Sequence, residues 1–128
     1  MTELSGRSIA IFDTSADTLG MLEAWFHTIG VAVHAMTTAV DAAAASALLR
    51  RVSPDVIVFD VAMPYDAHVD RLRRLHEAGV FGSIPLIVTT TNRKALTALP
   101  LPDTLRIHTI VEKPYDVEVL VQHVAAAL

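Results

Sequence analysis

Five short apolar runs alternate with segments of helical periodicity, and this alternation restricts the fold of the chain more than any other feature. The predicted strands cover residues 8–12, 31–36, 55–59, 84–89 and 105–111. The third run is nearly all apolar, as expected for a strand that is covered on both faces. Strands that alternate with helices in this way favour a parallel sheet with helices packed on both sides.

The helices between the strands are predicted from capping residues and apolar stripes. Ser15 can cap a helix that runs to about Ile29, where Gly30 is a suitable stop. Thr38 followed by Asp41 resembles a capping box at the start of a second helix. The remaining helices are predicted at about residues 66–78, 92–99 and 116–128, with inward stripes Val69, Leu72 and Leu75 in the first of these and Val117, Leu120, Val121, Val124 and Leu128 in the last.

The length of the chain selects one arrangement of these units. At 128 residues the chain is too short for an eight-unit barrel. We therefore predict one α/β domain over residues 1–128, with a doubly wound, five-stranded parallel sheet of flavodoxin-like order and helices on both faces. In such a sheet the ligand crevice lies outside the carboxyl ends of the strands, at the switch between the first and third strands.

Composition excludes several classes of function. The chain is 52% hydrophobic and 19% charged, with a formal net charge of −4, so it is globular and carries no basic tail for nucleic acid. The cluster Arg71, Arg73 and Arg74 is interpreted as a solvated helix face. Zero cysteines exclude disulfides and thiol chemistry, which fits a cytoplasmic protein. We also expect no signal peptide and no membrane span.

Three of the predicted strands lead directly into charged residues. Asp13 follows the first strand and Asp60 the third, while the fifth leads through Glu112 to Lys113. A charge at the end of a buried strand costs free energy unless something uses it. Because the carboxyl ends of parallel strands share one edge of the sheet, two carboxylates and a lysine are expected to meet there. Together, these three side chains would form a site for a cation and a phosphoryl group.

The same residues lie in four segments that together resemble the receiver domain of bacterial two-component response regulators. Each segment is weakly specific, but their order and spacing cover nearly the whole chain. They are residues 9–13 (IAIFD), 54–64 (PDVIVFDVAMP), 84–91 (IPLIVTTT) and 112–115 (EKPY).

The resemblance implies a role for each matching position. Asp60 corresponds to the aspartate that accepts a phosphoryl group, with Asp13, Asp60 and the backbone carbonyl of Ala62 as ligands of Mg²⁺. Lys113 corresponds to the lysine that pairs with phosphoryl oxygens, and Thr90 to the switch hydroxyl. Hard oxygen ligands of this kind suit Mg²⁺.

The resemblance also implies partners and one backbone feature. The phosphoryl group would come from a histidine kinase or a phosphotransfer protein, and the response would pass to a downstream protein or output domain. A receiver of this kind is a signalling switch and not a conventional enzyme. The family usually has a cis peptide bond at the position of Pro114. Pairing of two copies through the last helix or the fifth strand is left open.

The largest departure from the family pattern is Thr14, which stands where receivers usually carry a second acidic residue. Loss of one carboxylate weakens the predicted metal site and also lowers the repulsion between the carboxylates and a phosphoryl group. We expect the affinity for Mg²⁺ to be lower by about one to two decades. This is the loss of one attraction between a carboxylate and a dication, most of which is cancelled by the cost of desolvation.

Other departures concern the surroundings of the site and its output. Ala67 and His68 replace a frequent Asp-Gly pair, and we interpret His68 as an exposed residue near the start of a helix. Ile110 stands at the aromatic switch position. The short segment 92–102 replaces a full fourth helix. We interpret Met63 as filling the core or a loop. The other histidines show no metal-ligand spacing and are interpreted as surface or strand-packing residues: His27, His34, His76, His108 and His123.

Two other functions compete with a phosphorylated receiver. Thr14, Ile110 and the short fourth helix favour a pseudo-receiver, a binding module that keeps the fold without phosphorylation. Residues 12–15 (FDTS) also loosely resemble the nucleophile motif of haloacid-dehalogenase-type phosphohydrolases. That motif requires a second aspartate where Ser15 stands, and the chain has no room for a cap domain.

Overall fold

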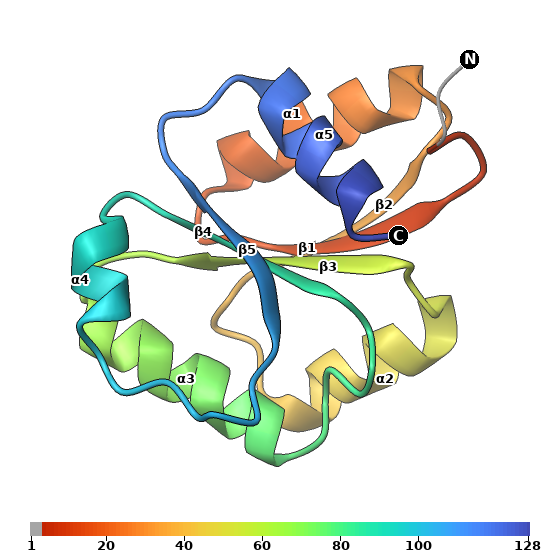
Figure 1. The fold of residues 1–128 in the computed structure, drawn as a ribbon. Coiled ribbons are helices and arrows are strands. Elements are labelled where there is room, and N and C mark those ends of the chain that lie inside the picture. The colour runs from red at the N-terminus through yellow and green to blue at the C-terminus, as the bar shows by residue number, and fades with distance from the viewer. Residues whose placement is uncertain (1–3) are drawn as a thin grey trace.

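The structure is a computed structural model that describes residues 4–128. It confirms the predicted alternation of strands and helices (Figure 1). The strands are β1 (Ser8–Phe12), β2 (Ala32–Met36), β3 (Val56–Val61), β4 (Leu86–Thr90) and β5 (Ile107–Glu112). The helices are α1 (Ala16–Thr28), α2 (Ala42–Val52), α3 (Tyr65–Glu77), α4 (Arg93–Thr97) and α5 (Val117–Ala126).

The five strands form one parallel sheet in the order β2-β1-β3-β4-β5. This is the predicted doubly wound, flavodoxin-like arrangement. The chain moves outward from β1 to β2, returns to β3 on the other side of β1, and then continues to β4 and β5. The first and third strands are therefore neighbours, with Ile9 opposite Val56 and Phe12 opposite Phe59. This topology brings the carboxyl ends of β1 and β3 together.

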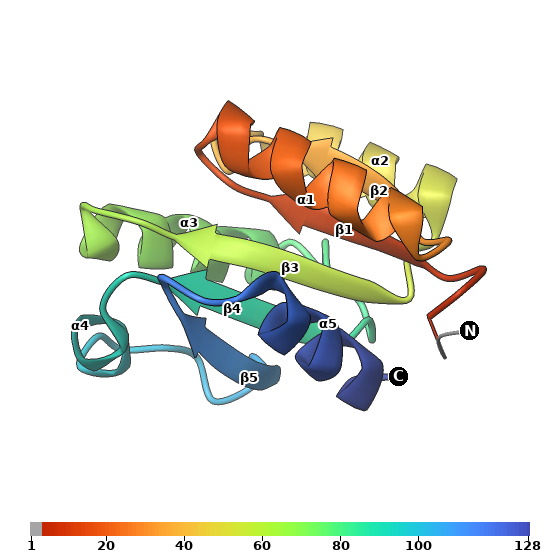
Figure 2. The same ribbon diagram turned by 90° about the horizontal axis from the view of Figure 1, so that it is seen from above.

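Helices cover both faces of the sheet. Figure 1 shows α1 and α5 on one face and α2, α3 and α4 on the other, and Figure 2 shows the same layers from above. Every residue of β3 is buried, because β3 lies between these layers. The buried cluster under α1 and α5 includes Ile9, Ile11, Val56, Val58, Leu22, Phe26, Leu120 and Val124. The cluster on the other face includes Phe12, Phe59, Phe81, Leu48, Leu72 and Leu96.

The predicted caps were partly correct. Ser15 caps α1 by accepting a hydrogen bond from the amide of Thr18, as predicted. The capping box of Thr38 was wrong. The cap of α2 is Asp41, whose extended backbone lets its carboxylate accept from the amide of Ala44 at 2.7 Å. Thr38 lies too far upstream to reach these amides and is instead fully buried, and its hydroxyl has no hydrogen-bond partner among residues 4–128.

The ends of the later helices also differ slightly from prediction. α3 begins at Tyr65, directly after Pro64, and its predicted inward stripe is buried. α5 begins after Asp116 and buries Leu120 and Val124. Leu128 was wrongly placed in the apolar stripe, because α5 ends at Ala126 and the Leu128 side chain is 45% exposed. Within residues 4–128 no helix is long and apolar enough to cross a membrane.

Three phenylalanines join β1, β3 and the start of the loop before β4. The Phe59 ring centroid lies 5.6 Å from that of Phe12 and 6.2 Å from that of Phe81.

Phe59→Ala is expected to lower the free energy of unfolding by about 3–5 kcal/mol, because it removes buried contacts and leaves a cavity. Urea denaturation measures this loss. Met21→Ala, at a side chain that is 46% exposed, is the control and should change stability by less than about 0.5 kcal/mol. A similar loss for both variants would contradict the assignment of Phe59 to the core.

Candidate functional site

Asp13, Asp60 and Lys113 meet at the carboxyl edge of the sheet, as their places in the sequence predicted. The Nζ atom of Lys113 lies 2.9 Å from Oδ2 of Asp13 and 3.1 Å from Oδ1 of Asp60. Both aspartates are only 3% exposed. Asp13 follows β1 and Lys113 follows β5, whereas Asp60 lies inside β3, one residue before its end. The lysine side chain thus links the two carboxylates from the turn after the edge strand β5.

Backbone and hydroxyl groups fix these carboxylates further. Oδ1 of Asp13 accepts a hydrogen bond from the amide of Ser15 at 2.9 Å. Oδ1 of Asp60 accepts from the hydroxyl of Thr89 at 2.7 Å. The amide of Lys113 donates to the carbonyl of Thr90 at 2.7 Å, which holds the start of the lysine turn against β4. Among residues 4–128, only Oδ2 of Asp60 receives no hydrogen bond from the protein, out of the four carboxylate oxygens.

Burial and charge act in opposite directions on the site. Burial raises the pKa of Asp60, and the Asp13 charge adds to the rise, while the hydrogen bond from Thr89 and the charge of Lys113 oppose it. Burial alone would lower the pKa of Lys113, but the hydrogen bonds and charges of Asp13 and Asp60 outweigh it and leave this pKa raised. The lysine therefore stays charged near neutral pH. One ammonium group thus faces two carboxylates in a site that is nearly buried.

Thr90, the predicted switch residue, lies near the site but points away from Asp60. Its hydroxyl donates to the backbone carbonyl of Val61 at 2.8 Å. The hydroxyl that contacts Asp60 belongs to Thr89, which the sequence predicted only as part of a strand. The period of two along β4 places Thr89 and Thr90 on opposite faces of the sheet, but the register with β3 decides which of them meets Asp60. Thr89 pairs with Asp60 in the parallel register, so both side chains lie on the same face of the sheet.

The loop after β3 corrects two predictions. His68 is buried, with 9% exposure, and was wrongly expected to be exposed. Its Nδ1 accepts a hydrogen bond from the amide of Ala62 at 3.2 Å, which explains the burial of a polar ring in the first turn of α3. Burial and the nearby charge of Arg71 lower the pKa of His68, consistent with a neutral ring. Met63 was wrongly expected to fill the core or loop, because it is 73% exposed.

Two prolines near the site follow cis peptide bonds. The bond between Lys113 and Pro114 is cis, as the family resemblance implied. The bond between Met63 and Pro64 is also cis, which was not predicted. Both bonds lie in the turns that follow charged strand ends.

The residues at this edge offer a divalent cation the right kind of ligand but few charges. Asp13 and Asp60 supply carboxylate oxygens, and Ala62 supplies a half-buried backbone carbonyl in the next turn. Oxygen donors of this type fit Mg²⁺. Thr14 is exposed and brings only a neutral hydroxyl. Among residues 4–128 no cluster of three or more acidic or histidine side chains could hold a metal ion, so the set is weaker than three carboxylates would be.

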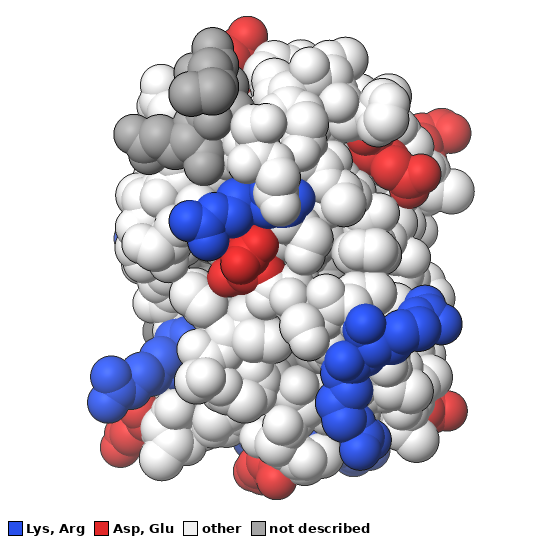
Figure 3. Space-filling view, turned by 90° about the vertical axis from the view of Figure 1, so that its right-hand side faces the viewer, with Lys and Arg blue, Asp and Glu red and all other residues white. Residues whose placement is uncertain are grey.

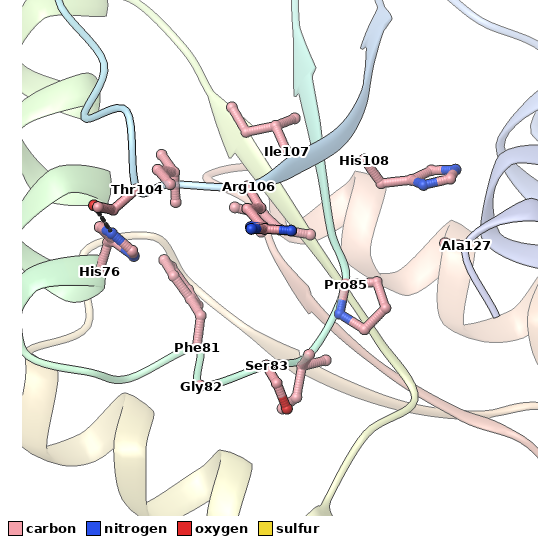
Figure 4. Close-up of a pocket in the computed structure, with 13 residues that line it drawn as sticks. His76, Phe81, Gly82, Ser83, Pro85, Thr104, Arg106, Ile107, His108 and Ala127 are labelled. Atoms are coloured by element: carbon pink, nitrogen blue, oxygen red, sulfur yellow. Dashed lines mark hydrogen bonds between the residues drawn. The ribbon is translucent and has the colours of Figure 1, made fainter.

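One cavity lies at the opposite end of the sheet from these charges. It has a volume of about 600 Å³ and lies at the amino ends of β4 and β5. Figure 4 shows Arg106, His108 and Pro85 around it, with His76 hydrogen-bonded to Thr104 on one side. Among residues 4–128, no carboxylate side chain lines this cavity, and Asp13, Asp60 and Lys113 take no part in it. The charged strand ends, and not the cavity, define the candidate site.

The arginines of α3 are largely paired with carboxylates of the same helix. On the face at the amino ends of the strands, Figure 3 shows the blue side chains in small groups, one of them directly against red side chains. On α3, Arg73 pairs with Asp70 and Glu77, and Arg74 pairs with Asp70 at 2.8 Å. Arg71 instead donates to the carbonyl of Thr38 at 3.1 Å. The arginine cluster is thus neutralised largely within its own helix, as expected for a solvated face.

Comparison with known protein families decides which family has this site. The family model of the response regulator receiver domain matches residues 9–125. The chain belongs to this family. The match spans all five strands and the turns that carry Asp13, Asp60 and Lys113. The resemblance inferred from the four sequence segments is therefore confirmed. Comparison with curated proteins found no significant match.

Solved structures of similar fold support the same architecture. A sensor protein from Polaromonas sp. JS666 is 20% identical with a TM-score of 0.76, covering 95% of each chain. The receiver domain of a signal transduction histidine kinase from Syntrophus aciditrophicus is 23% identical with a TM-score of 0.71, covering 96% of this chain and 90% of that chain. The chemotaxis protein CheY4 of Vibrio cholerae is 19% identical with a TM-score of 0.70, covering 95% and 98%. At these identities the likeness shows the fold.

The raised pKa of Asp60 leads to a stability prediction. A carboxyl whose pKa is higher in the folded protein than in the unfolded chain favours folding when it is protonated. That contribution is lost as the pH rises through the unfolded value of 3.8 to the higher folded value, so ionised Asp60 destabilises the fold at pH 7. Asp60→Asn should therefore raise the free energy of unfolding at pH 7, because the neutral amide has no charge to desolvate.

Thermal and urea denaturation at pH 7 and at pH 3 check this prediction. The gain from Asp60→Asn should shrink at the lower pH, because the wild-type carboxyl is then protonated. Asp66→Asn, at an exposed residue of α3, is the control for a change of net charge. A loss of stability at pH 7 would show that Asp60 stabilises the fold through Lys113 and Thr89.

Proposed function

We propose that residues 1–128 form a single receiver domain in which Asp60 accepts a phosphoryl group from a histidine kinase or a phosphotransfer protein. The observation that carries the proposal is the geometry of Asp60. Its carboxylate is nearly buried, one oxygen is held by Lys113 and Thr89, and the other receives no hydrogen bond from residues 4–128. An oriented, ionised oxygen is what in-line attack on phosphorus requires.

The other residues of the site have roles that follow from their charges. In the reaction a bond forms between an Asp60 oxygen and phosphorus while the bond from phosphorus to the donor breaks, and the leaving group takes the electron pair. The ammonium group of Lys113, now bound to two carboxylates, can turn to the phosphoryl oxygens. Asp13, Asp60 and the Ala62 carbonyl would hold Mg²⁺, which when bound neutralises charge on the phosphoryl group.

The response to phosphorylation would begin at Thr90. Its hydroxyl donates to the Val61 carbonyl, so it would have to leave that acceptor in order to reach the phosphoryl group. Ile110 has no hydroxyl and no aromatic ring to follow such a movement. The fourth helix is also short, with α4 covering only Arg93–Thr97. We infer that any output from this domain uses a surface other than the usual aromatic switch.

The same proposal covers partners and location. As a receiver, the domain is a signalling module that receives its phosphoryl group from another protein and passes the change to a downstream protein or output domain. We propose the cytoplasm as its location, because the proposed phosphoryl donors act there. Pairing of two copies through α5 or β5 is compatible with their position at one edge of the fold. No direct role in binding nucleic acid is proposed.

Phosphorylation is tested by incubating the protein with a small phosphodonor such as phosphoramidate and Mg²⁺. The mass should increase by one phosphoryl group in the wild type, and Asp60→Asn should abolish the increase because the attacking oxygen is lost. Asp66→Asn is the matched control and should behave as the wild type. Beryllofluoride, a mimic of the phosphoryl group, should shift NMR signals near Asp60. No mass increase and no shift at millimolar Mg²⁺ would support the pseudo-receiver instead.

The affinity for Mg²⁺ is expected to depend on position 14. Thr14 is exposed and directly follows Asp13, so an aspartate fits there without disturbing the core. Thr14→Asp should raise Mg²⁺ affinity by about 10–100-fold, because it adds a carboxylate beside Asp13. NMR titration with Mg²⁺ measures the affinity without need of phosphorylation. Thr18→Asp is the control, because it adds the same charge about one turn further along the chain, in α1. An equal gain in both variants would argue against a metal ligand at position 14.

A further inference from the structure

The hydrogen bond from Thr89 to Asp60 is a buried contact of the site to which no role has been assigned so far. Thr89 is 1% exposed and Asp60 is 3% exposed, and the 2.7 Å bond between them is buried. The acceptor is an ionisable carboxylate, and hydrogen bonds to charged acceptors are roughly twice as strong as those between neutral groups. The resemblance to receivers assigns no role to Thr89, because it assigns the functional hydroxyl to the next residue.

The bond makes the two oxygens of Asp60 unequal. Oδ1 accepts from both Thr89 and Lys113, whereas Oδ2 receives no hydrogen bond from residues 4–128. Oδ2 is not one of the polar atoms of residues 4–128 that are both fully buried and unpaired, so a small part of its surface reaches solvent. An oxygen that is free of donors and open to solvent can approach phosphorus, and one that already holds two donors cannot do so without losing them.

Lys113 alone would not fix the carboxylate in this way. Its ammonium group is shared with Asp13 at 2.9 Å, and it is the group expected to turn to the phosphoryl oxygens. Thr89 is different, because it lies inside β4, in register with Asp60 on the neighbouring strand β3. Its β-branched side chain has few rotamers, and the sheet fixes its backbone. The threonine hydroxyl therefore keeps its place when the lysine moves.

We propose that Thr89 is a positioning residue for phosphoryl acceptance: its hydroxyl holds Oδ1 of Asp60 and leaves Oδ2 as the attacking oxygen. This inference rests on the proposed function of Asp60. The bond that forms is Oδ2–P, the bond that breaks joins phosphorus to the donor, and the donor's leaving group keeps the electron pair. Oδ1 keeps the hydrogen bond from Thr89 before and after the transfer.

The test compares Thr89→Val, Thr89→Ser and the wild type. Valine keeps the shape of threonine and removes the hydroxyl, while serine restores it. Thr109→Val, on β5, is the control for the same change at a half-buried threonine with no hydrogen bond to Asp60. The initial rate of phosphorylation by phosphoramidate with Mg²⁺ should fall about tenfold in Thr89→Val, which is the scale of one hydrogen bond to a charged group. It should recover in Thr89→Ser and stay unchanged in Thr109→Val.

A spectroscopic measurement separates positioning from simple loss of structure. Fluorine NMR of the beryllofluoride adduct reports the environment of the group bound to Asp60. Its signals should change in Thr89→Val and match the wild type in Thr89→Ser and Thr109→Val. Thermal denaturation confirms that each variant is folded under the conditions of the assay.

Each other outcome overturns the inference in an identifiable way. Equal rates in Thr89→Val and the wild type would show that the hydroxyl has no part in the reaction, while Asp60 remains the acceptor. A rate in Thr89→Ser as low as in Thr89→Val would show that the side chain acts by packing and not by its hydroxyl. A wild type that is neither phosphorylated nor able to bind beryllofluoride would overturn the proposed function together with the inference.

Discussion

The contact of one lysine with two buried carboxylates is the interaction on which the rest of the site depends. Asp13 and Asp60 lie at the ends of neighbouring strands, where the topology forces them together and burial raises the cost of their charges. Lys113 reaches them from β5 and contacts both. The sheet order, the turn after β5 and the burial of the strand ends all serve to hold this lysine in place.

Much of this arrangement could be predicted from the sequence. Alternating apolar and helical segments predicted the sheet, because the strands of such a chain must be covered on both faces. The charges of Asp13, Asp60 and Lys113 predicted the site, because they directly follow or end buried strands. These are local patterns that need only the order of the elements. The family match over residues 9–125 confirms the resemblance to receivers.

The details that the sequence did not predict depend on contacts across the fold. Whether His68 is exposed depends on the amide of Ala62, which the loop after β3 turns toward it. Whether Thr89 or Thr90 contacts Asp60 depends on the register between β3 and β4, which three consecutive threonines do not reveal. Thr38 appeared to be a cap because its spacing was right, but Asp41 lies closer to the free amides. In each case an unpredicted neighbour decided the outcome.

The absence of a second acid at position 14 and the presence of Thr89 can be considered together. A site with two carboxylates and one lysine repels an incoming phosphoryl group less than a site with three carboxylates, but it also attracts a dication less strongly. Weaker metal binding leaves more of the orientation of Asp60 to the protein itself. A neutral hydroxyl on β4 can supply that orientation without adding charge. Both features fit the proposed function, in which Asp60 would be oriented more by fixed hydrogen bonds and less by a cation.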